Sequence, residues 1–94
     1  MKYELSQHAK DSVAEREIPT EWIERVLNSP ARRMPDRRDP TLEHRLGIID
    51  EFGGKALRVM VNPAVVPIRV VTVYFDRTMN GATGVSDIDG VPRR

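Results

Sequence analysis

A helical pattern that breaks at residues 17–19 most constrains the fold of this 94-residue chain. Pro19 pushes the residue before it out of the α region, so residues 5–30 predict two short helices rather than one long helix. Two helices of this length cannot enclose a core by themselves. They need the apolar segments that follow within residues 46–75, so the sequence predicts helices packed on a β-sheet.

Both predicted helices carry recognisable start signals. Ser6 can cap the first helix by accepting a hydrogen bond from a backbone N–H. Pro19 and Thr20 can begin the second, because proline is tolerated in a first turn. The second helix shows an apolar stripe that we expect to be buried, made of Trp22, Ile23, Val26 and Leu27.

The second half of the chain predicts three strands. The first spans about residues 44–52, the second 55–62 and the third 68–75, whose nearly continuous apolar character suits a central strand. Residues 1–5 add a short edge strand, and residues 31–43, with two prolines and alternating charges, predict an irregular, mobile loop. The expected fold class is α+β, with two N-terminal helices packed on a three- or four-stranded, mainly antiparallel sheet. Residues 1–77 form the single domain, and residues 78–94 form a flexible C-terminal tail.

Two adjacent glycines set the expected strand register. Gly53 and Gly54 predict a two-residue hairpin loop, because both can take positive φ. This register places Leu46 and Ile48 on the side that faces the helices, and Arg45 and Arg58 together on the other, more open side. Arg69 on the third strand can join them.

An open face with several arginines has two readings. It can be a basic surface for RNA phosphates or an acidic partner. The alternative is a solvated sheet face on which the arginine stems of Arg45 and Arg58 cover apolar neighbours.

The amino-acid composition limits which kinds of site and which cellular location are expected. The chain has no cysteine, which excludes disulfides and thiolate metal sites, and the expected location is the cytoplasm. No apolar run approaches the roughly 20 residues of a membrane span, so no membrane association is expected. The net charge is +1, but residues 31–45 are locally basic, with five arginines against three acidic residues. Arginine suits phosphate, and it equally suits a solvated loop.

The two histidines, His8 and His44, lack metal-ligand spacing, so no metal or cofactor is predicted. His8 falls in the first turn of the first helix, where it can act as a general acid or base or hydrogen-bond a neighbouring backbone group. Arg16 lies two helical turns further on and can bind a phosphate or the last carbonyls of its own helix.

The run LSQHAKDSVAEREIPTEWIERVLNSP, followed by LRVMVNPAVVPIRVVTVYFDR, resembles a small bacterial family of domains of unknown function. The resemblance covers roughly residues 3–77. That family is similar to the BrnT and RelE/ParE toxins of type II toxin–antitoxin modules. The resemblance implies an α+β toxin-like domain that pairs with an antitoxin protein, and matching polar positions at His8, Arg16, Arg45 and Arg77. The chain departs from the family pattern at Ser12, where an arginine is frequent.

Two functional hypotheses follow from the residues and the resemblance together. The first is a toxin-like endoribonuclease that acts on messenger RNA, with RNA or the ribosome as partner and His8, Arg45 and Arg58 as candidate catalytic residues. Electrostatic stabilisation by arginines can carry much of such a reaction. Arg16, Arg69 and Arg77 are the candidate binding residues. The second is a non-catalytic protein- or RNA-binding module, which needs only backbone groups and pockets.

Overall fold

The residues that the structure describes, 2–77, form two helices and a five-stranded sheet in this computed structural model. The elements are β1 (Tyr3–Leu5), α1 (Gln7–Arg16), α2 (Thr20–Asn28), β2 (Arg32–Pro35), β3 (Glu43–Ile49), the 3-10 turn η1 (Asp50–Phe52), β4 (Lys55–Asn62) and β5 (Ile68–Asp76). The predicted flexible tail, residues 78–94, lies outside the described residues.

The sheet is mixed, with strand order β1-β5-β4-β3-β2. β1 runs parallel to β5, and the other neighbouring strands are antiparallel. The predicted α+β class and the predicted edge strand near the N-terminus are therefore confirmed. The predicted number of strands is wrong, because a fifth strand, β2, lies inside the segment that was expected to be a loop.

The sequence does not predict β2, because this segment has the composition of an edge strand. It is four residues long, contains two arginines and ends at Pro35. Charges and proline are common at sheet edges, where the outer backbone groups need no strand partner. Its ladder with β3 pairs Arg33 with Arg45 and Met34 with His44.

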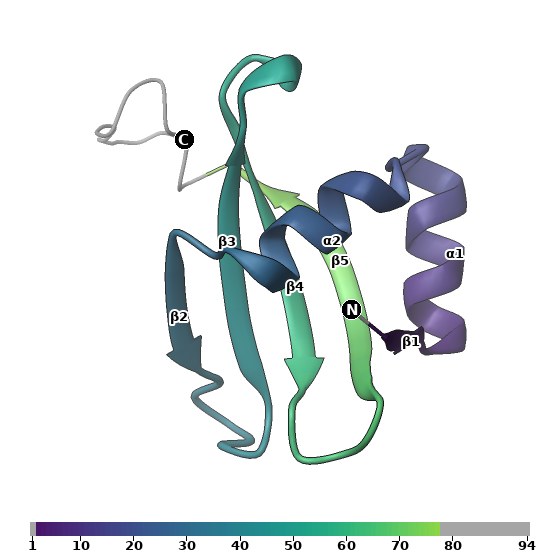
Figure 1. The fold of residues 1–94 in the computed structure, drawn as a ribbon, viewed down its shortest axis with the longest axis vertical. Coiled ribbons are helices and arrows are strands. Elements are labelled where there is room, and N and C mark those ends of the chain that lie inside the picture. Colours follow the sequence, from purple (N-terminus) through teal and green to yellow (C-terminus); the bar gives the residue numbers. More distant parts are fainter. Residues whose placement is uncertain (1, 78–94) are drawn as a thin grey trace.

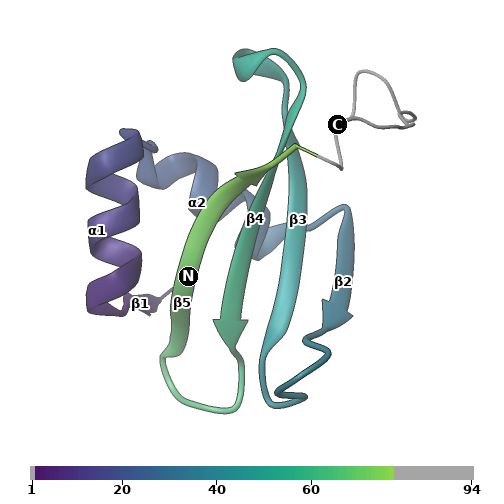
Figure 2. The same cartoon turned by 180° about the vertical axis from the view of Figure 1, so that it is seen from behind.

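The helices cover only one side of the sheet. α2 crosses that side over β3 and β4, whereas α1 lies beside β5 at the β1 edge (Figure 1). Seen from behind, β2 to β5 lie in front of α2, and neither helix covers this face (Figure 2). We call this side of β2–β5 the open face.

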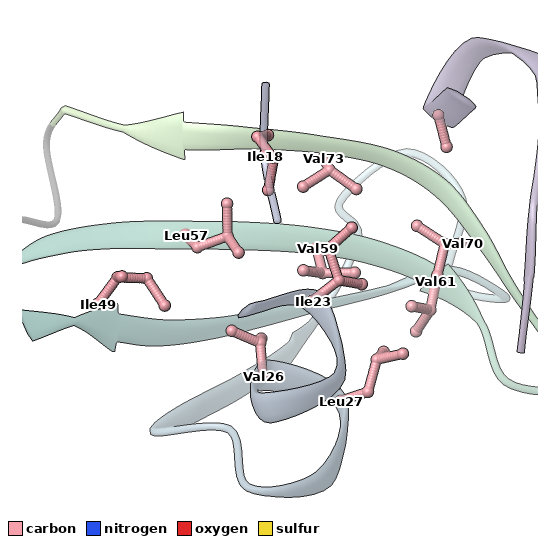
Figure 3. Close-up of a cluster of buried hydrophobic side chains, with 11 residues drawn as sticks. Ile18, Ile23, Val26, Leu27, Ile49, Leu57, Val59, Val61, Val70 and Val73 are labelled. Atoms are coloured by element: carbon pink, nitrogen blue, oxygen red, sulfur yellow. The ribbon is translucent and has the colours of Figure 1, made fainter. Parts of the chain in front are cut away.

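The core lies between α2 and the covered side of the sheet (Figure 3). Ile23, Val26 and Leu27 of α2 are buried there, as the apolar stripe predicts, while Trp22 is only partly buried at its margin. The strands contribute Ile49 of β3, alternate residues of β4 and two residues of β5 on either side of the irregularity at Val71, which are Leu57, Val59, Val61, Val70 and Val73.

Ser6 ties α1 to the sheet. Its Oγ accepts a hydrogen bond from the backbone N–H of Ala9 at 3.0 Å, which confirms the predicted cap. The same hydroxyl donates to the carbonyl oxygen of Val71 at 2.8 Å. Val71 is the residue that interrupts the β4–β5 ladder between its pairs at Met60 and Val61, so the cap anchors α1 at an irregularity of the central sheet.

The β3–β4 connection differs from the predicted two-residue hairpin. Gly53 and Gly54 do take positive φ, at 68° and 71°, but η1 precedes them and the ladder begins at Ile49 opposite Lys55. The predicted register paired Lys55 with Phe52, three residues further along the chain. Because three is odd, the faces of β3 are exchanged relative to the prediction while those of β4 are correct.

Candidate functional site

Arg45 and Arg58 lie on opposite faces of the sheet, so the prediction that they share the open face is wrong. Arg45 pairs with the core residue Val59, whereas Arg58 pairs with Leu46. Arg45 is 9% exposed, and its guanidinium donates to the carbonyl oxygen of Leu27 at 3.1 Å and to Glu43 at 2.9 Å. It thus satisfies a carbonyl in the last turn of α2, where a cation is electrostatically favoured.

The open face carries a hydrogen-bonded chain of four ionisable side chains, which we call the open-face cluster: Asp36, His44, Arg58 and Asp76. Nε2 of His44 lies 2.7 Å from Oδ1 of Asp36, and Nδ1 of His44 lies 3.0 Å from a terminal nitrogen of Arg58. Arg58 donates through Nε at 2.9 Å, and also through a terminal nitrogen, to the carboxylate of Asp76. The side chains of Arg58 and Asp76 are only 14% and 10% exposed, so this ion pair is well shielded from water.

The donors fix the tautomer of His44. A guanidinium can only donate, so Nδ1 of His44 accepts from Arg58, and Nε2 carries the proton that it donates to Asp36. This hydrogen bond, with backbone N–H donors from Asp39 and Arg38, lowers the pKa of the Asp36 carboxyl from 3.8 to about 2. Asp36 is therefore a carboxylate at neutral pH.

A hollow of about 500 Å³ adjoins the cluster, and we call it the β2 hollow. Its lining includes His44, Arg58 and the loop residues Arg37 and Arg38. Asp36 holds that loop in a turn by accepting from the backbone N–H groups of Arg38 and Asp39 at 3.0 and 2.9 Å. Within residues 2–77 the side chains of Arg37 and Arg38 form no ion pair, so the rim of the hollow is positively charged.

Arg16 and Arg77, two of the predicted binding residues, meet at a second hollow of about 270 Å³. It lies between the end of α1 and the adjoining ends of β4 and β5, and its other lining residues are Phe52, Lys55, Phe75 and Asp76. We call it the β5 hollow. Because Asp76 lines it and also binds Arg58 of the β2 hollow, one ion pair lies between the two sites.

The remaining predicted site residues lie elsewhere. His8 is exposed in the first turn of α1. This helix lies at the edge of the sheet opposite to β2 (Figure 1). Arg69 is exposed near the start of β5 and lies 3.6 Å from Glu4 of the neighbouring β1. Neither residue lines the β2 or the β5 hollow.

The sequence does not predict the contacts of Arg58 with His44 and Asp76, or the contact of His44 with Asp36. The spacing of His44 argues only against a metal site, and Asp36 lies in the segment predicted to be a loop. The available signal is the Asp36–Asp39 spacing, which is typical of a turn closed by an aspartate side chain. This turn reverses the chain so that β2 can pair with β3.

In the described part of the chain, no helix is both long and apolar enough to cross a membrane. No three or more histidine, aspartate or glutamate side chains gather among residues 2–77 in a way that can hold a metal ion.

Comparison with known proteins identifies one relationship. A family model described as "Domain of unknown function (DUF4258)" matches residues 5–75, which span both helices and nearly the whole sheet. Searches of curated proteins and of solved structures found no match.

Proposed function

The chain belongs to the DUF4258 family of domains of unknown function, and we propose that it is an RNA-binding, toxin-like domain that cleaves RNA on its open face. The observation that carries this proposal is the open-face cluster, which joins a histidine and an arginine beside the β2 hollow. The toxin-like part of the proposal rests on the resemblance of the sequence to BrnT and RelE/ParE toxins.

Arg58 is the proposed phosphate ligand. It is held by Asp76 at one end and His44 at the other, so its guanidinium is oriented before any ligand arrives. Arginine binds phosphate oxygens through parallel N–H donors, and a positioned cation stabilises the charge that develops during phosphoryl chemistry. Arg37 and Arg38 at the rim of the hollow supply further attraction for the RNA backbone.

His44 is the proposed proton carrier. When a phosphate takes the Arg58 donor, Nδ1 of His44 becomes available to accept the proton of the RNA 2′-hydroxyl. The 2′-oxygen then attacks phosphorus and the bond from phosphorus to the 5′-oxygen breaks. The leaving 5′-oxygen takes up one proton from water, and His44 returns its proton to water. The products are a 2′,3′-cyclic phosphate and a 5′-hydroxyl, and Asp36 keeps the histidine ring oriented throughout.

A salt titration of RNA binding tests the phosphate contact. Arg58→Gln is expected to weaken binding of a labelled single-stranded RNA and to reduce the slope of log K against log[salt] by about one. Arg69→Gln, which removes an exposed arginine remote from the cluster, is the matched control. Its slope of log K against log[salt] should lie closer to that of the wild-type protein than the slope of Arg58→Gln does. Equal slopes for the wild-type protein and Arg58→Gln would remove Arg58 from the interface.

Inducible expression in bacteria tests the toxin-like activity. Wild-type protein is expected to arrest growth, and Arg58→Gln to relieve the arrest at equal protein levels. Growth that continues with the wild-type protein, together with intact RNA in vitro in the presence of ribosomes, would contradict the proposal.

The free edge of β2 favours a second candidate, a non-catalytic binding module. In the described residues β2 has a strand neighbour on one side only, so its outer backbone groups can receive an extended peptide from a partner such as an antitoxin. The backbone N–H of Arg33 faces away from β3, so a partner complex whose affinity is unchanged in Arg58→Gln, but which is lost when Arg33 is replaced by proline, would favour this candidate.

A further inference from the structure

The β5 hollow combines an exposed aromatic ring with three cationic side chains. Phe52 is 42% exposed although it is a large apolar residue, and it lines the hollow with Arg16, Lys55 and Arg77. An exposed aromatic ring beside cationic side chains is the combination with which proteins bind single-stranded nucleic acid.

Phe52 is supported as a rigid platform. Its ring centroid lies 4.8 Å from that of Phe75 and 5.6 Å from that of Trp22. The ammonium group of Lys55 lies over the Phe52 ring, 4.6 Å from its centroid, so a base that stacks on this ring takes the place of the ammonium, which is then available for the phosphate. A ring held by two aromatic neighbours loses little entropy when a planar ligand stacks on it.

The charges around the ring favour an anionic ligand. Asp76 is the carboxylate in the lining, and it is already neutralised by Arg58. Arg16 and Lys55 form no ion pair with any residue from 2 to 77, so their charges remain available. Anions are therefore attracted to the same hollow that exposes an aromatic ring.

We infer that the β5 hollow binds one unpaired nucleotide, with its base stacked on Phe52 and its phosphate held by Arg16 and Lys55. A site of about 270 Å³ is close to the lower end of the range for small-ligand sites and suits a single nucleotide better than a folded partner. The inference rests on the proposed function in one respect, that the nucleotide belongs to the RNA strand bound at the open-face cluster. The Arg58–Asp76 ion pair lies between the two hollows, so one strand can contact both.

The single tryptophan provides a local reporter. Trp22 lies next to Phe52, so a base stacked in the β5 hollow is expected to quench or shift its fluorescence. The probe is adenosine 5′-monophosphate titrated into the full chain, with adenosine and inorganic phosphate titrated separately. We expect saturable binding of the nucleotide that is at least about tenfold tighter than that of either part, since stacking and charge each contribute.

Substitutions separate stacking from general attraction. Phe52→Leu and Arg16→Gln should each weaken nucleotide binding about tenfold, while Phe52→Tyr, which keeps an aromatic face, should retain it. Lys10→Gln is the matched control, because Lys10 is an exposed cation of α1 that lines neither hollow, and it should not change binding of the mononucleotide. Thermal unfolding monitored by circular dichroism checks that each variant is folded. If Phe52→Leu does not fold, Arg16→Gln, which changes an exposed side chain, still tests the nucleotide site.

The outcomes distinguish this inference from the proposed function. Absence of a saturable Trp22 signal, or equal binding by wild type and Arg16→Gln, overturns the nucleotide site even if RNA is still cleaved. Tight phosphate binding without any contribution from adenosine overturns the stacking role. Nucleotide binding that requires Phe52, in a protein that does not bind or cleave RNA through Arg58, supports the nucleotide site and rejects the proposed function.

Discussion

Gly47 of β3 lies directly beneath Val26 of α2, and a β-carbon at this glycine would lie 2.7 Å from Cγ2 of Val26. Real β-carbons do not approach another carbon so closely. The absence of a side chain at Gly47 therefore sets how near α2 packs to the sheet, and with it the position of the Leu27 carbonyl that Arg45 binds.

Replacing Gly47 with alanine should destabilise the fold. We expect Gly47→Ala to lower the free energy of unfolding by about 1–3 kcal/mol, as measured by urea denaturation, because the added methyl group overpacks the helix–sheet contact. Val26→Ala removes the opposing methyl groups, so the double variant should be less destabilised than the sum of the single changes. If the losses of unfolding free energy in the two single variants add up to that of the double variant, the contact between Gly47 and Val26 does not limit the packing.

Arg45 is expected to contribute to the stability of the fold. Arg45→Met keeps much of the apolar stem but leaves the Leu27 carbonyl without its donor, so we expect a loss of about 2 kcal/mol in urea denaturation. Arg33→Met is the control, because Arg33 binds the same Glu43 while its own side chain is 58% exposed. Its effect should stay within about 1 kcal/mol. Equal losses in the two variants would contradict the capping role of Arg45.

The helix cap at Ser6 should contribute measurably to the stability of the fold. Ser6→Ala removes both the acceptor for the Ala9 N–H and the donor to the Val71 carbonyl, and should cost about 1–2 kcal/mol of unfolding free energy. Ser29→Ala is the control, because Ser29 is exposed and its side chain forms no hydrogen bond with another residue from 2 to 77. A Ser6→Ala protein as stable as the control would show that water replaces both contacts.

Asp36 should make the fold sensitive to acid. Because its folded pKa of about 2 lies below its ordinary value of 3.8, it stabilises the folded state above about pH 4, and this contribution is lost as pH falls from about 4 to about 2. Asp36→Asn should therefore flatten the pH dependence of stability in that window. Glu15→Gln, an exposed carboxyl that forms no ion pair with the described residues, is the control. An unchanged slope in Asp36→Asn would contradict the His44 contact.

His44 rather than His8 should support RNA cleavage. Under the proposed function, His44→Gln lowers the rate of RNA cleavage about 10²- to 10⁴-fold, the usual contribution of a general acid or base. His8→Gln, an exposed change on α1, should leave the rate within about twofold of wild type. The measurement is single-turnover cleavage of labelled RNA. A larger loss in His8→Gln would move the site to α1.

Local signals predicted much of the helical segment and little of the site. Ser6, the break at Pro19 and the buried residues Ile23, Val26 and Leu27 follow from capping, proline sterics and helical periodicity, which act within a few residues. The site depends on Asp36 and His44, which meet only because β2 pairs with β3. A four-residue, arginine-rich strand has no local pattern that distinguishes it from a loop.

The sequence by itself determined where the helices begin and break, the α+β class, and which residues of β4 face the core, because each depends on neighbours along the chain. Only the tertiary structure decided the faces of β3. The residues of η1 do not pair with β4 and contact other parts of the fold instead. Phe52 packs on Trp22 and Phe75, and Glu51 forms an ion pair with Arg25 of α2. Because the resulting shift of three residues is odd, Arg45 lies under α2 and His44 joins Arg58 on the open face.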